Sequence, residues 1–172
     1  MEHKNKTKMI AKPGVQEVVV IREFDAPREW VFKAWITPSL YAQWIGPRDH
    51  ITQVETMDPK PGGSWRYIQT DPAGGKHAFH GYYHEVTAPE RIIDTFEYDN
   101  LPEKGHVIFE AVSFEKMPDH RTRVTERIVF LSVTDRDGMV QSGMEMGMYQ
   151  SHERLDELLT ILLVEKPGQV NE

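Results

Sequence analysis

The stretch GMEMGMYQSHERLDELL, residues 143–159, decides the fold. Its second half has the spacing of an amphipathic helix, and the same period continues on both sides of it. We therefore expect one long helix from about residue 138 to residue 164. At about 100° per residue, one stripe of this helix collects the residues that should face the interior. They are Val140, Gly143, Met144, Gly147, Met148, Ser151, Leu155, Leu158 and Leu162.

Two glycines four positions apart are the unusual feature of this stripe. Glycine inside a helix costs roughly 0.5 to 1 kcal/mol relative to alanine, so Gly143 and Gly147 need a geometric reason. Either the sheet backbone approaches the helix closely there, or space is left for a ligand. Met144 and Met148 fit a ligand pocket because methionine adapts to varied apolar partners, although ordinary core packing explains them equally well.

The chain before this helix is predicted to consist mainly of short strands. Its separators are short and rich in Pro, Gly, Asp and Asn, so consecutive strands should be antiparallel neighbours. Asp25, and Thr37 or Ser39, are the expected caps of two short helices. The predicted elements are a strand at about 15–24, helices near 25–35 and 37–44, and strands at about 49–58, 64–70, 77–87, 91–99, 106–117 and 121–132.

This order predicts an α+β fold of the helix-grip type. A curved seven-stranded antiparallel sheet would wrap around the long C-terminal helix, with two short helices after the first strand. We expect a mobile polar N-terminal arm at 1–14, a single domain at 15–165 and a C-terminal tail at 166–172.

Composition excludes several classes of protein. The 172 residues are 39% hydrophobic and 27% charged, as in an ordinary soluble domain. The formal net charge of −7 argues against a protein that wraps nucleic acid or binds an anionic membrane. No run approaches the roughly 18 apolar residues of a spanning helix. The absence of cysteine removes disulfides and thiolate chemistry, and it fits a cytoplasmic location.

Five motifs, in this order, resemble the START-like or Bet v 1-like (SRPBCC) superfamily and, within it, the family named after the activator of Hsp90 ATPase homologue. They are DAPREWVFKAW (25–35), QWIGP (43–47), PGGSWRY (61–67), GYYHEV (81–86) followed by PERII, and the opening stretch (143–159). The resemblance implies a helix-grip fold whose cavity takes lipids, sterols, polyketides or other apolar molecules. The chain departs from the family at Ile45, often a second aromatic residue, and at Met148, often tryptophan.

The candidate ligand-binding residues are the aromatic residues that an alternating sheet can turn inward, together with the glycine and methionine half of the helix stripe. Each is explained singly by core packing, whereas together they resemble the wall of an apolar site. A slip of one residue in register would turn the sheet residues outward. The set is Trp35, Trp44, Trp65, Tyr67, Phe79, Tyr83, Phe96, Gly143, Met144, Gly147 and Met148.

Histidines suggest a metal site only at first sight. On one strand, His80 and His84 would lie about 13 Å apart at roughly 3.3 Å per residue, while His77 would point the other way. We therefore predict no metal and no other cofactor. His152 has no acid near it on the buried stripe, so we expect it to be exposed or satisfied within the protein.

Three strand carboxylates complete the candidate chemistry. Asp94, Glu110 and Glu126 are expected mainly on the outer face or in ion pairs with arginines. The arginines in question are Arg91, Arg123 and Arg127. The alternative is that the carboxylates point into the cavity and serve in catalysis, because some superfamily members are cyclases or hydrolases.

The favoured prediction is non-enzymatic binding of a small hydrophobic ligand, such as a lipid, a polyketide or an aromatic molecule. One alternative is an enzyme of cyclase or hydrolase type that uses the same cavity. Another, from the family name, is an interaction domain with a chaperone partner. The separate N-terminal domain of the eukaryotic Hsp90 co-chaperone is not seen, so ATPase activation is not expected. The oligomeric state stays open, and a homodimer is one alternative.

Overall fold

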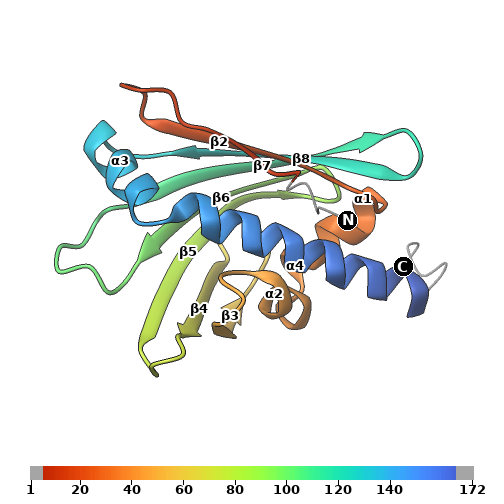
Figure 1. Cartoon of the computed structure of the whole chain (residues 1–172), viewed down its shortest axis with the longest axis horizontal. Coiled ribbons are helices and arrows are strands. Elements are labelled where there is room, and N and C mark those ends of the chain that lie inside the picture. Colours follow the sequence, from red (N-terminus) through yellow and green to blue (C-terminus); the bar gives the residue numbers. More distant parts are fainter. Residues whose placement is uncertain (1–5, 166–172) are drawn as a thin grey trace.

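An eight-stranded antiparallel sheet curves around one long helix (Figure 1). The computed structural model describes residues 6–165, and in that range the strand order is β1-β2-β8-β7-β6-β5-β4-β3. The strands are β1 (Lys8–Ile10), β2 (Glu17–Phe24), β3 (Ile51–Met57), β4 (Ser64–Thr70), β5 (Lys76–Thr87), β6 (Arg91–Tyr98), β7 (Ile108–Met117) and β8 (Arg121–Val129). The helices are α1 (Arg28–Ile36), α2 (Pro38–Trp44), α3 (Val133–Gln141) and α4 (Met144–Glu165).

The helix-grip prediction is confirmed, and the predicted strands end within three residues of the observed ones. The count of seven strands is wrong, because β1 pairs with residues 19–21 of β2 and adds an edge strand. Residues 8–10 of the predicted N-terminal arm form this edge strand. The three-residue run KMI is too short to show the periodicity of a strand, and these residues form a strand because they pair with β2. Residues 1–5 and the predicted tail at 166–172 lie outside the described residues.

The long C-terminal helix is interrupted, contrary to the prediction of one helix over residues 138–164. Helix α3 ends at Gln141, and Gly143 follows with φ of +97°. This left-handed conformation is the usual role of a glycine just after a helix. The hydrophobic periodicity of the sequence continues across this point, whereas the helical conformation of the backbone is interrupted there. Gly143 is therefore a helix terminator, whereas Gly147 lies within α4.

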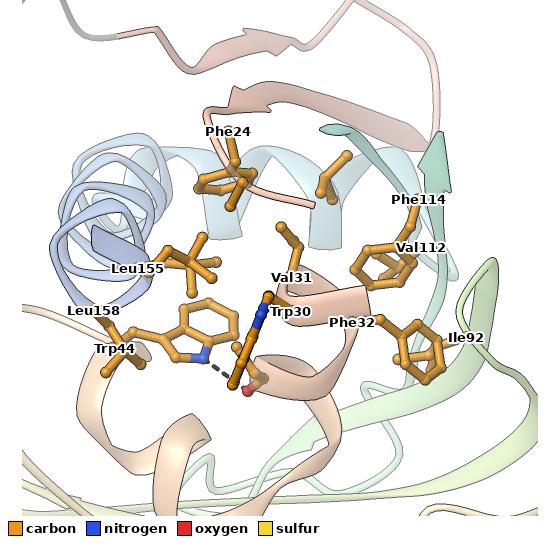
Figure 2. Packing of buried hydrophobic residues seen from close by; sticks show 14 of the residues in the cluster. Phe24, Trp30, Val31, Phe32, Trp44, Ile92, Val112, Phe114, Leu155 and Leu158 are labelled. Atoms are coloured by element: carbon orange, nitrogen blue, oxygen red, sulfur yellow. Dashed lines mark hydrogen bonds between the residues drawn. The ribbon is translucent and has the colours of Figure 1, made fainter. Parts of the chain in front are cut away.

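The C-terminal half of α4 is held by a solid hydrophobic core. Leu155 is fully buried, and with Leu158 it packs against Trp44 and the side chains of α1 (Figure 2). Trp44 is itself fixed, because its Nε1 donates to the backbone oxygen of Ala34 at 3.0 Å. This core anchors the C-terminal half of α4. The N-terminal half of the helix is not part of it and lies over a different part of the sheet.

The two short helices lack the predicted side-chain caps. The N-cap position of α1 is Pro27, and Asp25 instead accepts hydrogen bonds from Lys6 Nζ at 3.1 Å and Arg121 Nε at 3.2 Å. Thr37 does occupy the N-cap position of α2, but its side chain makes no capping hydrogen bond. Within residues 6–165, no helix has both the length and the apolar character needed to cross a membrane.

Candidate ligand-binding cavity

A cavity of about 310 Å³ lies between the N-terminal half of α4 and the inner face of the sheet. Nine of the eleven predicted site residues line it: Trp35, Trp44, Tyr67, Phe79, Phe96, Gly143, Met144, Gly147 and Met148. The other two, Trp65 and Tyr83, line a smaller chamber of about 40 Å³. The two spaces share Trp35, Tyr41, Phe96 and Glu110, so the small chamber extends the cavity inward.

The helix side of the cavity is open at Gly147. A Cβ atom built on Gly147 would meet no atom within 4 Å, so close approach of the sheet does not explain this glycine. Met144 and Met148 are partly buried and pack against a second apolar cluster, which includes Ile108 and Ile128. Flexible side chains next to an empty position leave this wall able to adapt.

The opposite wall is a layer of aromatic rings. Tyr67 stacks between Trp65 and Phe79, with ring centroids 5.6 and 5.1 Å away. Phe96 contacts Trp65 and Phe79 at 5.8 and 5.4 Å. Gly81 is the register partner of Trp65, and a Cβ atom there would come within 2.7 Å of the indole ring. The motifs PGGSWRY and GYYHEV therefore pair across two strands, and the glycine of one makes room for the tryptophan of the other.

Three carboxyl groups face this interior, which corrects the expectation of an outer face. Asp94 lies directly opposite Glu110 on the neighbouring strand, and both line the smaller chamber. Glu110 and Glu126 line the larger cavity. The arginines expected beside them lie elsewhere: Arg91, Arg123 and Arg127 pair with Glu85, Glu23 and Glu17.

A period of two already places these carboxylates inward. Asp94 stands between Ile92 and Phe96, Glu110 between Ile108 and Val112, and Glu126 between Val124 and Ile128, at two-residue spacing. Those flanking apolar residues are buried or line the cavity. The sequence analysis favoured the outer face for these three residues and kept the cavity as the alternative, because ionisable residues are seldom inside a protein and that general tendency outweighed the alternation.

Burial changes the ionisation of the paired carboxyls. It raises the pKa of Asp94 to about 8, and the charge of Glu126 adds to this effect. Burial also raises the pKa of Glu110 well above its ordinary value, with further contributions from Asp94 and Glu126. The indole N–H of Trp65 acts in the opposite direction and lowers the pKa of Asp94. Asp94 Oδ1 is buried without a hydrogen-bond partner among the described residues.

Glu126 differs from the other two because it has a basic partner. Its Oε1 lies 2.8 Å from Nε2 of His152, and the histidine Nδ1 lies 3.0 Å from the hydroxyl of Thr7. Arg22 Nη1 donates to the same hydroxyl at 3.2 Å and also pairs with Asp156. His152 is thus buried and satisfied, one of the two expected alternatives, and the acid comes from β8 rather than from its own helix.

Tyrosine hydroxyls supply further polar groups on the cavity wall. Burial raises the pKa of Tyr41, Tyr67 and Tyr83, and the neighbouring carboxyls raise it further. All three phenols therefore stay protonated at neutral pH. Each can donate a hydrogen bond to a ligand or to a carboxylate.

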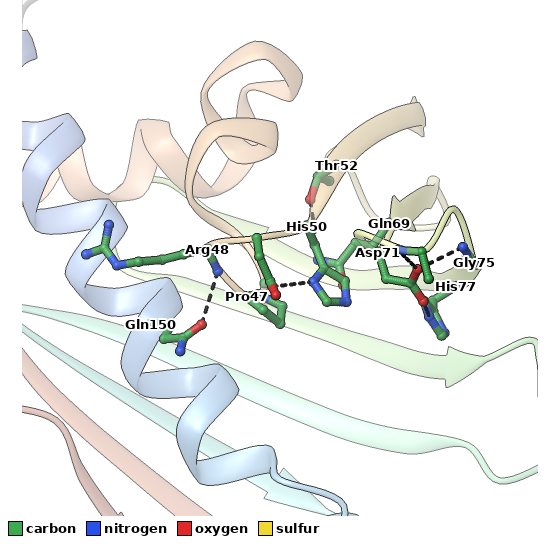
Figure 3. A network of polar contacts seen from close by, with 12 residues as sticks. Pro47, Arg48, His50, Thr52, Gln69, Asp71, Gly75, His77 and Gln150 are labelled. Carbon is green, nitrogen blue, oxygen red and sulfur yellow. Dashed lines mark hydrogen bonds and ion pairs between the residues drawn. The ribbon is translucent and has the colours of Figure 1, made fainter.

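The loop after α2 closes one side of the cavity and is tied to α4. The backbone amide of Gly46 donates to Ser151 Oγ at 2.8 Å. The backbone amide of Arg48 donates to Gln150 Oε1 at 3.1 Å (Figure 3). Arg154 Nη1 donates to three consecutive backbone oxygens at 3.0 to 3.3 Å, those of Ile45, Gly46 and Pro47. This loop and the helix therefore form one continuous wall.

The histidines of β5 are engaged with neighbouring acids. His77 Nε2 lies 3.0 Å from Asp71 Oδ2, and His80 Nδ1 lies 2.5 Å from Asp99 Oδ1. In the described part of the chain, no group of three or more histidine, aspartate or glutamate side chains is arranged to hold a metal ion.

A second groove, of about 410 Å³, was not predicted. It lies between α3 and the loop after β6, with Leu101, Phe130 and Leu131 among its walls. It shares Ile108, Met139 and Ser142 with the main cavity, so the two meet beside the break between α3 and α4. The sequence carries little indication of this groove, because its walls come from separate loops and helix ends.

Comparisons with known proteins agree with this architecture. The solution structure of a protein from Arthrobacter aurescens is 24% identical, with 96% of this chain and 95% of that chain covered and a TM-score of 0.82. The crystal structure of a Rhodobacter sphaeroides protein is 23% identical over 91% and 99% of the two chains, with a TM-score of 0.82. The AHSA1 protein from Silicibacter pomeroyi is 19% identical over 87% and 99%, with a TM-score of 0.68.

These solved structures establish the likeness of fold. No curated protein matches the chain significantly. The family described as "Activator of Hsp90 ATPase homolog 1-like protein" matches residues 25–160, which include all five motifs. With this match over most of its length, and with a START-like helix-grip fold, the chain belongs to the Activator of Hsp90 ATPase homolog 1-like family.

Proposed function

We propose that this protein binds a small molecule with a largely apolar body in the cavity between α4 and the sheet. The observation that carries the proposal is Gly147, whose position on the inner side of α4 opens onto unfilled space opposite an aromatic wall. Small-molecule sites are typically clefts of roughly 300 to 1,000 Å³ with mainly apolar walls and a few polar groups. The cavity of about 310 Å³ fits the lower end of that range.

The volume limits the size of the ligand. At about 30 Å³ for each water-sized group, the main cavity holds roughly ten non-hydrogen atoms. An alkyl chain or a substituted aromatic ring of that size is a suitable probe, whereas a sterol would need the groove beside α3 as well. Decanol is therefore a reasonable neutral test ligand.

The proposal is tested with a matched pair of glycine substitutions. Gly147→Leu places a bulky side chain in the cavity. Gly138→Leu places the same side chain in the neighbouring groove, because Gly138 on α3 lines that groove and not the cavity. Neither glycine has a positive φ, and neither has a contact that blocks a Cβ atom. Both variants should therefore fold, which circular dichroism and thermal melting would verify.

Calorimetry with decanol should show at least about a ten-fold loss of affinity for Gly147→Leu and little change for Gly138→Leu. The opposite pattern would assign the ligand to the groove. Failure of decanol and of an aromatic probe such as naphthol to bind the parent protein would contradict the proposed function.

Catalysis in the same cavity is a second candidate, favoured by the facing pair of Asp94 and Glu110. A carboxylate with a pKa near neutral in an apolar site is suited to act as a general base. Nitrobenzisoxazole is a suitable probe: a base takes its carbon-bound proton, the C–H electrons form a nitrile, and the N–O bond breaks to leave a phenolate. The parent should open the ring faster than Asp94→Asn and Glu110→Gln, with a rate that rises toward pH 8. Equal rates in all three proteins would count against catalysis.

A further inference from the structure

The acidic wall of the cavity is not explained by a purely apolar ligand. Three carboxyl groups reach the cavity or its inner chamber, from Asp94, Glu110 and Glu126. Among the described residues that line either space there is no lysine and no arginine. Among these described lining residues the only basic group is His152, and it is hydrogen-bonded to Glu126. The sheet side of the site therefore carries acidic groups, and Asp94 and Glu110 have no basic side chain beside them among these lining residues.

The inner chamber also contains a carboxyl oxygen that lacks a hydrogen-bond partner among residues 6–165. This atom is Asp94 Oδ1, which is buried. Buried polar atoms are nearly always paired, so an unpaired acceptor at the end of a cavity indicates that a donor from another molecule completes it.

Aromatic rings surround these carboxyls on several sides. Tyr83 is the register partner of Asp94, and Trp35, Trp65 and Phe96 line the same chamber. The faces of aromatic rings carry partial negative charge, so they attract a cation placed over them. Carboxyls and aromatic faces together form an environment that favours positive charge and disfavours anions.

We infer that the ligand is an amine: a primary ammonium group binds between Asp94 and Glu110, and its apolar body extends along the aromatic wall toward Gly147. This inference rests on the proposed function, whose site it shares. An ammonium group has three N–H donors for the carboxyl oxygens, of which Asp94 Oδ1 lacks a partner, and its charge replaces the proton that burial otherwise holds there. A neutral alcohol brings no compensating charge, and a fatty acid anion is repelled.

Proton release follows from this arrangement. Near pH 6 the carboxyl pair is protonated, so binding of an ammonium ion expels a proton, and affinity should rise as the pH approaches 8. The tyrosines that face the pair do not produce this change, because Tyr41, Tyr67 and Tyr83 stay protonated in this range. Glu126 also faces the cavity, and its carboxyl group is hydrogen-bonded to His152.

Three probes with the same alkyl chain test the inference: decylamine, decanol and decanoate, each below its micelle-forming concentration. Calorimetry at about pH 8 should give an affinity for decylamine at least about ten-fold higher than for decanol, with decanoate weakest. From about pH 6 to pH 8, decylamine affinity should rise by about ten-fold or more, while decanol affinity stays constant. Titrations near pH 6 in buffers of different ionisation enthalpy should show close to one proton released for each amine bound.

The double variant Asp94→Asn/Glu110→Gln keeps the shape of the pair and removes its charge. It should lose the preference for decylamine over decanol and the proton release. Glu115→Gln is the matched control, because Glu115 lies on β7 five residues from Glu110 and is exposed. It should leave all three affinities unchanged.

The outcomes separate this inference from the proposed function. If decanol binds but decylamine shows no advantage, or if the double variant retains the advantage, the inference of an amine is wrong while the apolar site stands. If none of the three probes binds and Gly147→Leu changes nothing, the site itself is wrong. Tight binding of decanoate would also overturn the inference, because it would require positive charge in the cavity.

Discussion

Replacing Asp94 with asparagine should stabilise this protein, and the gain should grow as the pH rises. In the unfolded chain the aspartate ionises around its ordinary pKa of 3.8, whereas in the folded protein its pKa is about 8. Between these two values the folded state binds more protons than the unfolded state. The stability of the parent therefore decreases as the pH rises from about 4 to about 8, and asparagine removes this dependence.

The size of the effect follows from the pKa difference. One pKa unit corresponds to about 1.4 kcal/mol, so the step from pH 5 to pH 8 has an upper limit of about 4 kcal/mol. Glu110 takes up part of the same protonation, and cavity water solvates part of the charge. Both reduce the effect of a single substitution, and we expect Asp94→Asn to gain about 2 kcal/mol over the parent across this range.

Urea denaturation at about pH 5, 6, 7, 8 and 9 measures this difference directly. The control is Asp119→Asn, in the turn after β7, where the residue is exposed and has φ of +60°, a conformation that asparagine tolerates. Asp119→Asn should change the free energy of unfolding by the same amount at every pH. If the Asp94→Asn curve also runs parallel to that of the parent, Asp94 is not held protonated in the interior, and our account of the inner chamber is wrong.

Three further predictions concern the packing and the polar network, and urea denaturation measures each of them. Leu155→Ala should lower the free energy of unfolding by about 2 to 5 kcal/mol, because Leu155 is fully buried in the core beneath α4; a loss under about 1 kcal/mol would contradict that packing. His152→Ala should cost about 2 to 3 kcal/mol, since it leaves the buried Glu126 carboxyl without its hydrogen-bond partner and removes one hydrogen bond of Thr7, and His152→Gln should recover part of this loss. Gly143→Ala should cost about 1 kcal/mol because of its positive φ, whereas Gly147→Ala should be neutral or stabilising by about 0.5 to 1 kcal/mol; equal effects would contradict the helix break.

Local patterns accounted for most of the framework. The strands β3 to β8 were predictable because alternation and turn residues act over a few positions, and each hairpin link is short. The same alternation placed Tyr67, Phe79 and Phe96 on the inner face. The alternation also indicated an inward Glu110, because the apolar residues on both sides of it are buried. The general tendency of charged residues to be exposed was nevertheless given more weight.

Other features depended on contacts between distant parts of the chain. The edge strand β1 exists through its pairing with β2, and its three residues carry no pattern of their own. Glu126 and His152 meet across 26 positions, on different elements, at a distance that only the docking of α4 sets. The pairing of Asp94 with Glu110 required the register of β6 against β7 in addition to the orientation of each strand.

The sequence alone determined that a long amphipathic helix would lie on a curved antiparallel sheet, because hydrophobic period and turn chemistry are local properties. It also singled out Gly143 and Gly147 as positions that need a reason. Only the tertiary structure showed that the two reasons differ: Gly143 adopts a left-handed conformation that ends α3, while Gly147 faces unfilled space. A cavity is the volume that no side chain fills. Its existence and its acidic wall therefore depended on how far α4 stands from the sheet, a distance set by packing along the whole helix.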